Sequence, residues 1–179
     1  MQDTKRKVLL IFGPGGSGKT SIAKRIAKNK KWMRITEDEF WAKIKKNHPP
    51  GEGRTPEEQK IAQYLAIKKI IKTLSTGKNV VFEFIIYENP PKPLIVYLKN
   101  LKKQEAEIFV RALKPSIKSI LSRHKIRGRH EDKNLKLAIF NTKLQFKCLN
   151  SKYIKKDWII DNSNESLEET YIKHFKAII

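Results

Sequence analysis

The chain has 179 residues, of which 39% are hydrophobic, and its 39 lysines and arginines exceed its 18 aspartates and glutamates by a formal net charge of +21. This length and composition predict a single globular domain, 1–179, and exclude a largely disordered chain. One cysteine cannot form an internal disulfide, and no apolar run approaches the roughly 20 residues that span a bilayer, so we expect a cytoplasmic protein without a membrane anchor.

The positive charge supports two interpretations. A strongly basic surface attracts partners that carry phosphate, and nucleic acid is the first of these to consider. However, only eight of the 39 basic residues are arginine, the residue that makes bidentate contacts to phosphates and bases. Lysines that simply coat solvent-facing helices give the same composition. The charge alone therefore leaves both interpretations open.

Short apolar runs alternate with longer helical patterns, which is typical of repeated strand–helix–strand units in a parallel sheet. In chain order we expect a strand at 7–12, a helix at 19–30, a strand at 32–35, helices at 36–46 and 55–75, a strand at 79–84, a helix from the proline cluster 89–93 to about 102, a strand at 106–112, helices at 115–125 and 132–147, a strand at 158–161 and a helix from 166. Thr55 with Glu58, and Ser166 with Glu169, have the spacing of a capping box at a helix start.

The first strand is followed by a glycine-rich segment, GPGGSGKT, that matches the phosphate-loop pattern GxxxxGK[ST]. Glycine lets the backbone N–H groups approach phosphate oxygens, and the following helix N-terminus favours anions. We expect Lys19 to reach the β and γ phosphates and the Thr20 hydroxyl to bind Mg²⁺. The alternative dinucleotide pattern GxGxxG also fits, but it gives no role to the lysine and threonine. The predicted nucleotide-binding residues are Gly13, Pro14, Gly15, Gly16, Ser17, Gly18, Lys19 and Thr20.

Two carboxylates stand where predicted strands end, at the sheet edge that carries active sites in such folds. Asp38 follows the second strand and could orient an acceptor hydroxyl and take its proton. Its alternative role is to complement a helix dipole, together with Glu37 and Glu39. Glu83 ends the third apolar run and could hold Mg²⁺ directly or through water, the alternative being a partly exposed acid at the sheet edge.

Basic residues gather after the fourth strand, in the segment RHKIRGR. Arg123 and Arg127 are four residues apart, so both face the same side of a helix, and Arg129 follows a glycine. Such a cluster could close over the transferring phosphates as a small basic lid, roughly 123–133. A solvated basic helix end is the alternative. The histidines and Cys148 show no metal-ligand spacing.

The phosphate loop, Asp38, Glu83 and the segment RHKIRGR together resemble the small P-loop kinases of the zeta-toxin, chloramphenicol phosphotransferase and polynucleotide 5′-hydroxyl kinase group. The resemblance implies an α/β P-loop NTPase fold, with a five-stranded parallel sheet in the order 2-3-1-4-5 and helices on both faces. It also implies that Asp38 acts on the acceptor hydroxyl, that Arg123 and Arg127 grip ATP phosphates, and that Asn162 and Ser163 belong to the adenine-side loop. The acceptor pocket would involve Arg34, Trp41 and the segments 48–54 and 85–91.

We therefore expect an ATP- and Mg²⁺-dependent kinase that moves the γ-phosphoryl group to a hydroxyl or phosphate acceptor. The acceptor is a nucleoside or nucleotide, another small metabolite or the 5′ end of a polynucleotide, and the net charge tilts the expectation toward the last. The alternative is a P-loop NTPase switch or a nucleic-acid-binding adaptor that hydrolyses ATP slowly and makes no phosphorylated product. The sequence contains no arginine-finger partner motif and no second domain that would favour a switch.

Overall fold

The structure is a computed structural model that describes residues 5–44, 55–128 and 134–179. Its centre is a five-stranded, all-parallel sheet in the order β2-β3-β1-β4-β5, which confirms the predicted strand order. The strands are β1 (Arg6–Phe12), β2 (Trp32–Thr36), β3 (Asn79–Phe84), β4 (Ala106–Leu113) and β5 (Ile159–Ile160). The helices are α1 (Lys19–Ile26), α2 (Asp38–Ile44), α3 (Pro56–Ser75), α4 (Lys92–Leu101), α5 (Ile117–Arg127), α6 (Leu135–Leu149) and α7 (Leu167–His174), with short 3₁₀ turns at η3 (Lys156–Trp158) and η4 (Lys176–Ile178).

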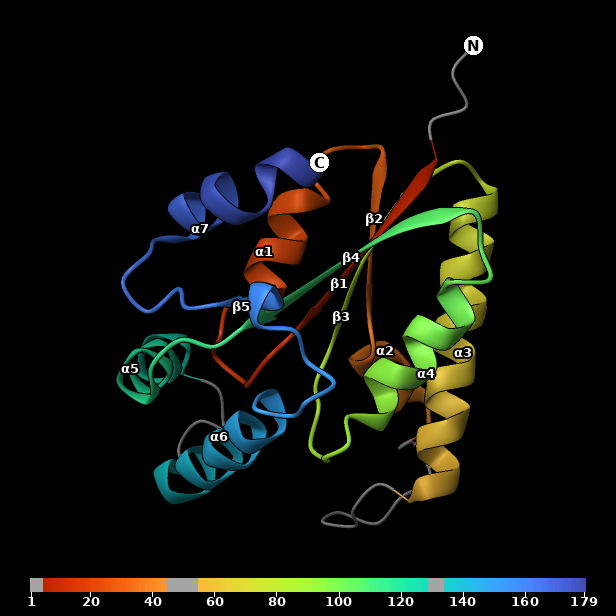
Figure 1. Cartoon of the computed structure of the whole chain (residues 1–179). Coiled ribbons are helices and arrows are strands. Elements are labelled where there is room, and N and C mark those ends of the chain that lie inside the picture. Colours follow the sequence, from red (N-terminus) through yellow and green to blue (C-terminus); the bar gives the residue numbers. More distant parts are fainter. Residues whose placement is uncertain (1–4, 45–54, 129–133) are drawn as a thin grey trace.

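Helices cover both faces of the sheet, as predicted, and each face has its own cluster of buried side chains (Figure 1). On one face α3, α4 and the end of α6 contribute side chains such as Ala66, Leu94 and Leu149. On the other face Ile22 of α1 and Phe175, directly after α7, are fully or almost fully buried. The central strand β1 is therefore covered on both sides, which explains its uninterrupted apolar sequence.

Side-chain caps start two of the helices at the predicted residues. The Thr55 hydroxyl accepts a hydrogen bond of 3.2 Å from the Glu58 backbone N–H, and the Glu58 carboxylate accepts one of 2.8 Å from Thr55. Ser166 and Glu169 make the same reciprocal pair at the start of α7. Both caps satisfy backbone donors that the first helical turn would otherwise leave without partners.

The last strand is shorter than its apolar sequence predicts. The segment 158–161 was expected to be extended throughout, but β5 spans Ile159–Ile160 alone. Trp158 instead closes the 3₁₀ turn η3, where its backbone N–H donates to the carbonyl of Lys155. Pairing of β5 with β4 is limited to Ala112 and Leu113 because β5 runs along the end of β4.

The parallel register brings the ends of several strands to one edge of the sheet. Phe12 ends β1, Phe84 ends β3 and is paired with it, and Thr36 ends β2 opposite Glu83. The loops that follow these strands therefore meet at one place. No helix among the described residues is both long and apolar enough to cross a membrane.

Candidate functional site

The loop between β1 and α1 has a backbone that two of its glycines make possible. Gly13 has φ +143°, and a Cβ there would lie 2.2 Å from the carbonyl oxygen of Leu113. Gly16 has φ +79°, and its Cβ would lie 2.6 Å from the imidazole ring of His124 on α5. Side chains at either position would meet both backbone strain and a steric clash. The sequence pattern is thus a requirement of the loop's own packing as well as of any ligand.

Lys19 is the first residue of α1, and its side chain bends back over the loop. Its ammonium Nζ donates hydrogen bonds of 2.7 Å to the carbonyl of Gly13 and 2.9 Å to that of Pro14. Burial lowers the pKa of Lys19 to about 8, although the carboxylates of Glu83 and Asp38 act in the opposite direction. The ammonium thus lies over the loop, where the oxygens of a bound phosphate group could replace the two carbonyl oxygens as its hydrogen-bond acceptors.

The loop also contains a buried polar atom that suits an anionic ligand. The Ser17 hydroxyl is buried and makes no hydrogen bond within the part of the chain that the structure describes. A buried hydroxyl without a partner costs free energy, about 1–3 kcal/mol. The donor set of the loop, with Lys19 beside it, therefore fits a phosphate group.

Thr20 and Glu83 meet at the carboxyl edge of the sheet. The Thr20 hydroxyl donates a hydrogen bond of 2.7 Å to Oε2 of Glu83, which is only 3% exposed. The other oxygen of Glu83, Oε1, accepts from Nε of Arg34 at 2.6 Å. The Thr20 oxygen keeps lone pairs for a cation, and oxygen is the ligand that Mg²⁺ prefers.

The described residues contain no group of three or more His, Cys, Asp or Glu side chains that could hold a metal ion. Mg²⁺ does not require such a cage, since it is usually bound by one or two protein groups together with water and substrate phosphates. Thr20 and Glu83 therefore fit a magnesium ion that arrives with a nucleotide.

Three consecutive acids after β2 have three different environments. Asp38 lines the cleft described below, on the first turn of α2. Glu37 points into the core, where it is 5% exposed and accepts a hydrogen bond of 2.5 Å from the hydroxyl of Tyr97. Glu39 forms an ion pair of 2.7 Å with Lys69 on α3. Of these three acids, Asp38 is the one that lines the cleft.

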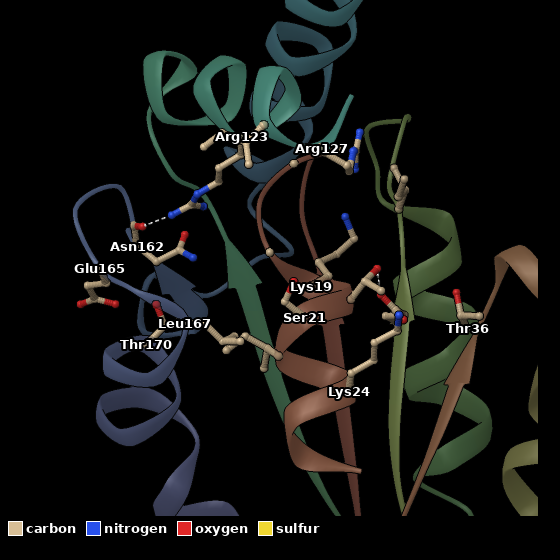
Figure 2. A pocket seen from close by; sticks show the side chains of 18 of the residues that line it. Lys19, Ser21, Lys24, Thr36, Arg123, Arg127, Asn162, Glu165, Leu167 and Thr170 are labelled. Carbon is tan, nitrogen blue, oxygen red and sulfur yellow. Dashed lines mark hydrogen bonds between the residues drawn. The ribbon is translucent and has the colours of Figure 1, made fainter. Parts of the chain in front are cut away.

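Arg123 of α5 contacts the protein backbone (Figure 2). Its guanidinium donates hydrogen bonds of 3.2 Å to the carbonyl of Ser17 and 2.6 Å to that of Asn162. The Asn162 side chain donates to the same Ser17 carbonyl at 3.1 Å. Burial lowers the pKa of Arg123 from its usual value, and Asp161 partly offsets this. Arg123 therefore ties the loop after β5 to the phosphate loop.

The other predicted residues of this region differ in their position relative to the cleft. Arg127 lies one helical turn further along α5, lines the cleft and points toward Lys19 (Figure 2). Ser163 is held away from the cleft, because its hydroxyl accepts a 2.7 Å hydrogen bond from the Ser116 backbone and its carbonyl accepts one of 2.9 Å from Ser119. Arg129 and the acceptor-pocket segment 48–54 lie outside the described residues, as do the last residues of the predicted lid.

These groups surround one cleft of about 720 Å³ with two distinct ends (Figure 2). Lys19 lies at its middle, next to the phosphate loop, and Thr20, the next residue of α1, also lines the cleft. One end is formed by the loop after β5 and the start of α7, with Asn162 and Leu167. The other end is formed by the ends of β2 and β3, where Thr36 lies, and Asp38, two residues further along the chain, also lines the cleft. The arrangement can hold an elongated ligand across the phosphate loop, with a second molecule approaching the carboxylate.

Several residues of the site have no clear signal in the sequence. The packing of His124 on Gly16 and the bond between Glu37 and Tyr97 both join residues that are far apart in the chain. Lys24 lines the cleft one turn after Thr20. Its spacing of four residues from Thr20 places both on one face of α1, and this is the signal in the sequence by which Lys24 could have been predicted.

Comparisons with known proteins agree with this geometry. A family model described as an AAA domain matches residues 8–146, whereas no curated protein matches the sequence significantly. The tunicamycin resistance protein of Deinococcus radiodurans has a similar structure, with a TM-score of 0.66 at 14% identity over 93% of this chain and 92% of that one. A sugar kinase from Janibacter sp. gives 0.65 at 17% identity over 94% and 91%.

A chain of the Pnkp1/Rnl/Hen1 RNA repair complex is also similar, with a TM-score of 0.57 at 16% identity over 82% of this chain. This chain spans 47% of that longer one. At such identities the likeness concerns the fold. Together with the family match, it confirms the resemblance to small P-loop kinases and the P-loop NTPase fold that were predicted from the sequence.

Proposed function

The chain belongs to the AAA domain family whose model matches it, and from that premise we propose that it is an ATP- and Mg²⁺-dependent phosphotransferase. In this proposal the γ-phosphoryl group moves to a hydroxyl or phosphate acceptor. The observation that carries it is the placement of Lys19, Thr20 and Asp38 along one cleft, with the phosphate loop between its two ends. Positioning and electrostatic stabilisation supply most of the catalysis in such a site.

The phosphate loop would hold the triphosphate. Lys19 would leave the carbonyls of Gly13 and Pro14 and bind the β and γ phosphate oxygens. The negative charge of these oxygens would stabilise the buried ammonium. The Ser17 hydroxyl would donate to an oxygen of the same group. Arg127, which points toward Lys19, would neutralise charge that develops on the transferring group.

Thr20 and Glu83 would hold the magnesium ion. The Thr20 hydroxyl donates a hydrogen bond to Glu83, so a lone pair of its oxygen is directed elsewhere and can bind the cation. The ion neutralises phosphate charge when it is bound with the nucleotide. Glu83 contributes by fixing the direction of the Thr20 hydroxyl and by adding negative charge close to the ion.

Asp38 would orient the acceptor and accept its proton. Asp38 follows Thr36, which lies on the side of the cleft away from the loop after β5, so an acceptor bound there would face the end of the triphosphate. General-base catalysis of this kind contributes about 10²–10⁴-fold to a rate. The nucleoside would lie at the opposite end, where Asn162, Arg123 and Leu167 border the cleft.

The acceptor could be a nucleoside or nucleotide, another small metabolite, or the 5′ end of a polynucleotide. The net charge of +21 supports a polyanionic acceptor because a basic surface concentrates nucleic acid near the cleft. The structural likeness to a chain of an RNA repair complex is compatible with this choice. The likeness to a sugar kinase is compatible with a small hydroxyl acceptor such as a sugar.

A panel of acceptors with ATP labelled at the γ-phosphate tests the proposal. The panel contains nucleosides, nucleotides, sugars and 5′-hydroxyl oligonucleotides, and label on one of these is the expected result. Release of free phosphate without any labelled acceptor would instead favour an NTPase switch. If an oligonucleotide is the acceptor, its binding should weaken steeply as salt increases, because phosphate contacts release counterions. A flat salt dependence would exclude the polynucleotide.

A further inference from the structure

Glu83 is held from two sides by groups of different elements. Thr20, at the start of α1, donates to Oε2 at 2.7 Å, and Arg34 of the edge strand β2 donates through Nε to Oε1 at 2.6 Å. A second guanidinium nitrogen of Arg34, Nη2, is in ion-pair contact with that same oxygen. Arg34 therefore grips one side of the carboxylate while Thr20 uses the other.

Glu83 depends on its contact with Arg34 because its carboxylate is buried. Glu83 is 3% exposed at the end of an apolar strand, between Phe82 and Phe84. Burying a carboxylate costs free energy unless a cation and hydrogen bonds replace the lost water. Arg34 provides both, and its side chain is 28% exposed, so the pair lies at the boundary between the core and the site.

The grip also determines the direction of the Thr20 hydroxyl. If Glu83 turned, Oε2 would leave Thr20, and the Thr20 proton could rotate toward the position of a cation. With Glu83 held by Arg34, the proton points to the carboxylate and the lone pairs of Thr20 point away from it. Groups that orient a metal ligand in this way commonly change metal affinity when they are altered.

We propose that Arg34 is a positioning residue for the magnesium site, acting through Glu83 and Thr20. The described residues that line the cleft include Glu83 of β3 and Thr36 of β2 but not Arg34, which the resemblance to small P-loop kinases placed in the acceptor pocket. The structure instead shows Arg34 on the Glu83 carboxylate, so it is placed to act there. This inference rests on the nucleotide and magnesium site of the proposed function.

The test is calorimetric titration of the chain with ATP, with Mg²⁺ present and with Mg²⁺ removed by a chelator. The variant is Arg34→Lys, which keeps the charge but loses the planar fork that holds one carboxylate oxygen through two nitrogens. The native chain should bind ATP more tightly with Mg²⁺ than without it. In Arg34→Lys this increase in affinity should be about tenfold smaller. Its affinity for ATP without Mg²⁺ should stay close to that of the native chain.

Arg25→Lys is the matched control. Arg25 also holds a carboxylate through two nitrogens, although on two oxygens: its Nε donates to Oε2 of Glu168 at 2.9 Å and its Nη2 to Oε1 at 2.8 Å, and neither residue lines the cleft. This variant should keep the full effect of Mg²⁺. A double variant, Arg34→Met with Glu83→Gln, removes the cation and the buried charge together, so it should fold while still binding ATP with little response to Mg²⁺.

The outcomes separate the two claims. If the native chain binds ATP no better with Mg²⁺ than without it, the proposed function fails and this inference fails with it. If the native chain responds to Mg²⁺ and Arg34→Lys responds equally, the positioning role alone is wrong. An Arg34→Lys chain with an unchanged Mg²⁺ response but a raised KM for the acceptor would likewise overturn it, because Arg34 would then act on the acceptor.

Discussion

The hydroxyl of Thr20 lies 2.7 Å from a carboxylate oxygen of Glu83, a residue 63 positions away in the sequence. The parallel pairing of β1 with β3 places Glu83 beside Ile11, one residue before the end of β1, so the loop that follows carries Thr20 back to it. A helix N-terminus, a hydroxyl and a buried carboxylate thus meet at a point that also receives Lys19. The predictions below test what each part of this arrangement contributes.

Asp38→Asn should reduce turnover about 100-fold or more while ATP binding is largely kept, because the change removes the proton acceptor and preserves the shape. Steady-state rates and ATP titration measure the two effects separately. Glu39→Gln is the control, since Glu39 pairs with Lys69 and does not line the cleft. Equal rates in the native and Asp38→Asn chains would show that Asp38 does not accept the proton of the acceptor.

Arg123→Met should lower the free energy of unfolding by about 1–3 kcal/mol and weaken ATP binding, because two hydrogen bonds from a charged donor to the backbone of Ser17 and Asn162 are lost. Urea denaturation measures the first effect. Lys125→Met, at an exposed position on the same helix, should leave both properties close to native. Normal stability together with lost turnover would show that Arg123 acts on ATP phosphates, as the sequence predicts.

Tyr97→Phe should destabilise the chain by about 1–3 kcal/mol, since it removes the hydroxyl that donates to the buried carboxylate of Glu37. The ring contacts of Tyr97 with Phe82 and Phe84 are kept by phenylalanine. Turnover should also fall, because Glu37 precedes Asp38 at the corner between β2 and α2. Thermal unfolding and steady-state rates test this, with the exposed Tyr64→Phe as control. An unchanged melting temperature would contradict the stabilising role.

ATP binding should take up a proton above the pKa of Lys19, which is about 8 in the ligand-free chain. Phosphate oxygens favour the charged ammonium and raise this pKa, so affinity should decline as pH rises through 8. Calorimetry in buffers of different ionisation enthalpy measures the uptake: we expect it at about pH 8.5 and not at about pH 6.5. Lack of uptake at the higher pH would mean that Lys19 does not meet the phosphates.

The same shift has a defined sign for folding. The unfolded chain holds this proton up to about 10.5 and the folded chain releases it near 8, so more protons are bound to the unfolded state between these values. Stability contributed by Lys19 therefore increases as pH rises from about 8 to about 10.5. Nucleotide binding opposes this trend, because it stabilises the protonated form.

Much of the fold follows from local features of the sequence. Periodicity identifies the strands, the phosphate loop fixes the central strand, and the pairs Thr55–Glu58 and Ser166–Glu169 set helix starts that the structure confirms. The extent of β5 could not be predicted in this way. Whether Trp158 extends a strand or closes a turn depends on where β4 ends, which is a tertiary relation.

The candidate site likewise contains residues that a local motif predicts and residues whose contacts depend on the tertiary structure. A motif predicts Lys19 and Thr20 because the phosphate-loop pattern is defined by residues that are neighbours in sequence. The contact between Arg34 and Glu83 joins two strands across 49 positions, and periodicity does not tell which side chain of an edge strand reaches across to its neighbour. For Arg123, helical spacing predicts the face it occupies but not that backbone carbonyls receive its guanidinium.

The central claim is that the cleft transfers the γ-phosphoryl group of ATP to an acceptor. It is tested most directly by following γ-labelled ATP with the native chain and with Lys19→Ala, using Lys28→Ala on the exposed surface as a control. The account predicts label on an acceptor with the native and Lys28→Ala chains and none with Lys19→Ala. Label that appears in free phosphate alone, or transfer that persists in Lys19→Ala, would contradict it.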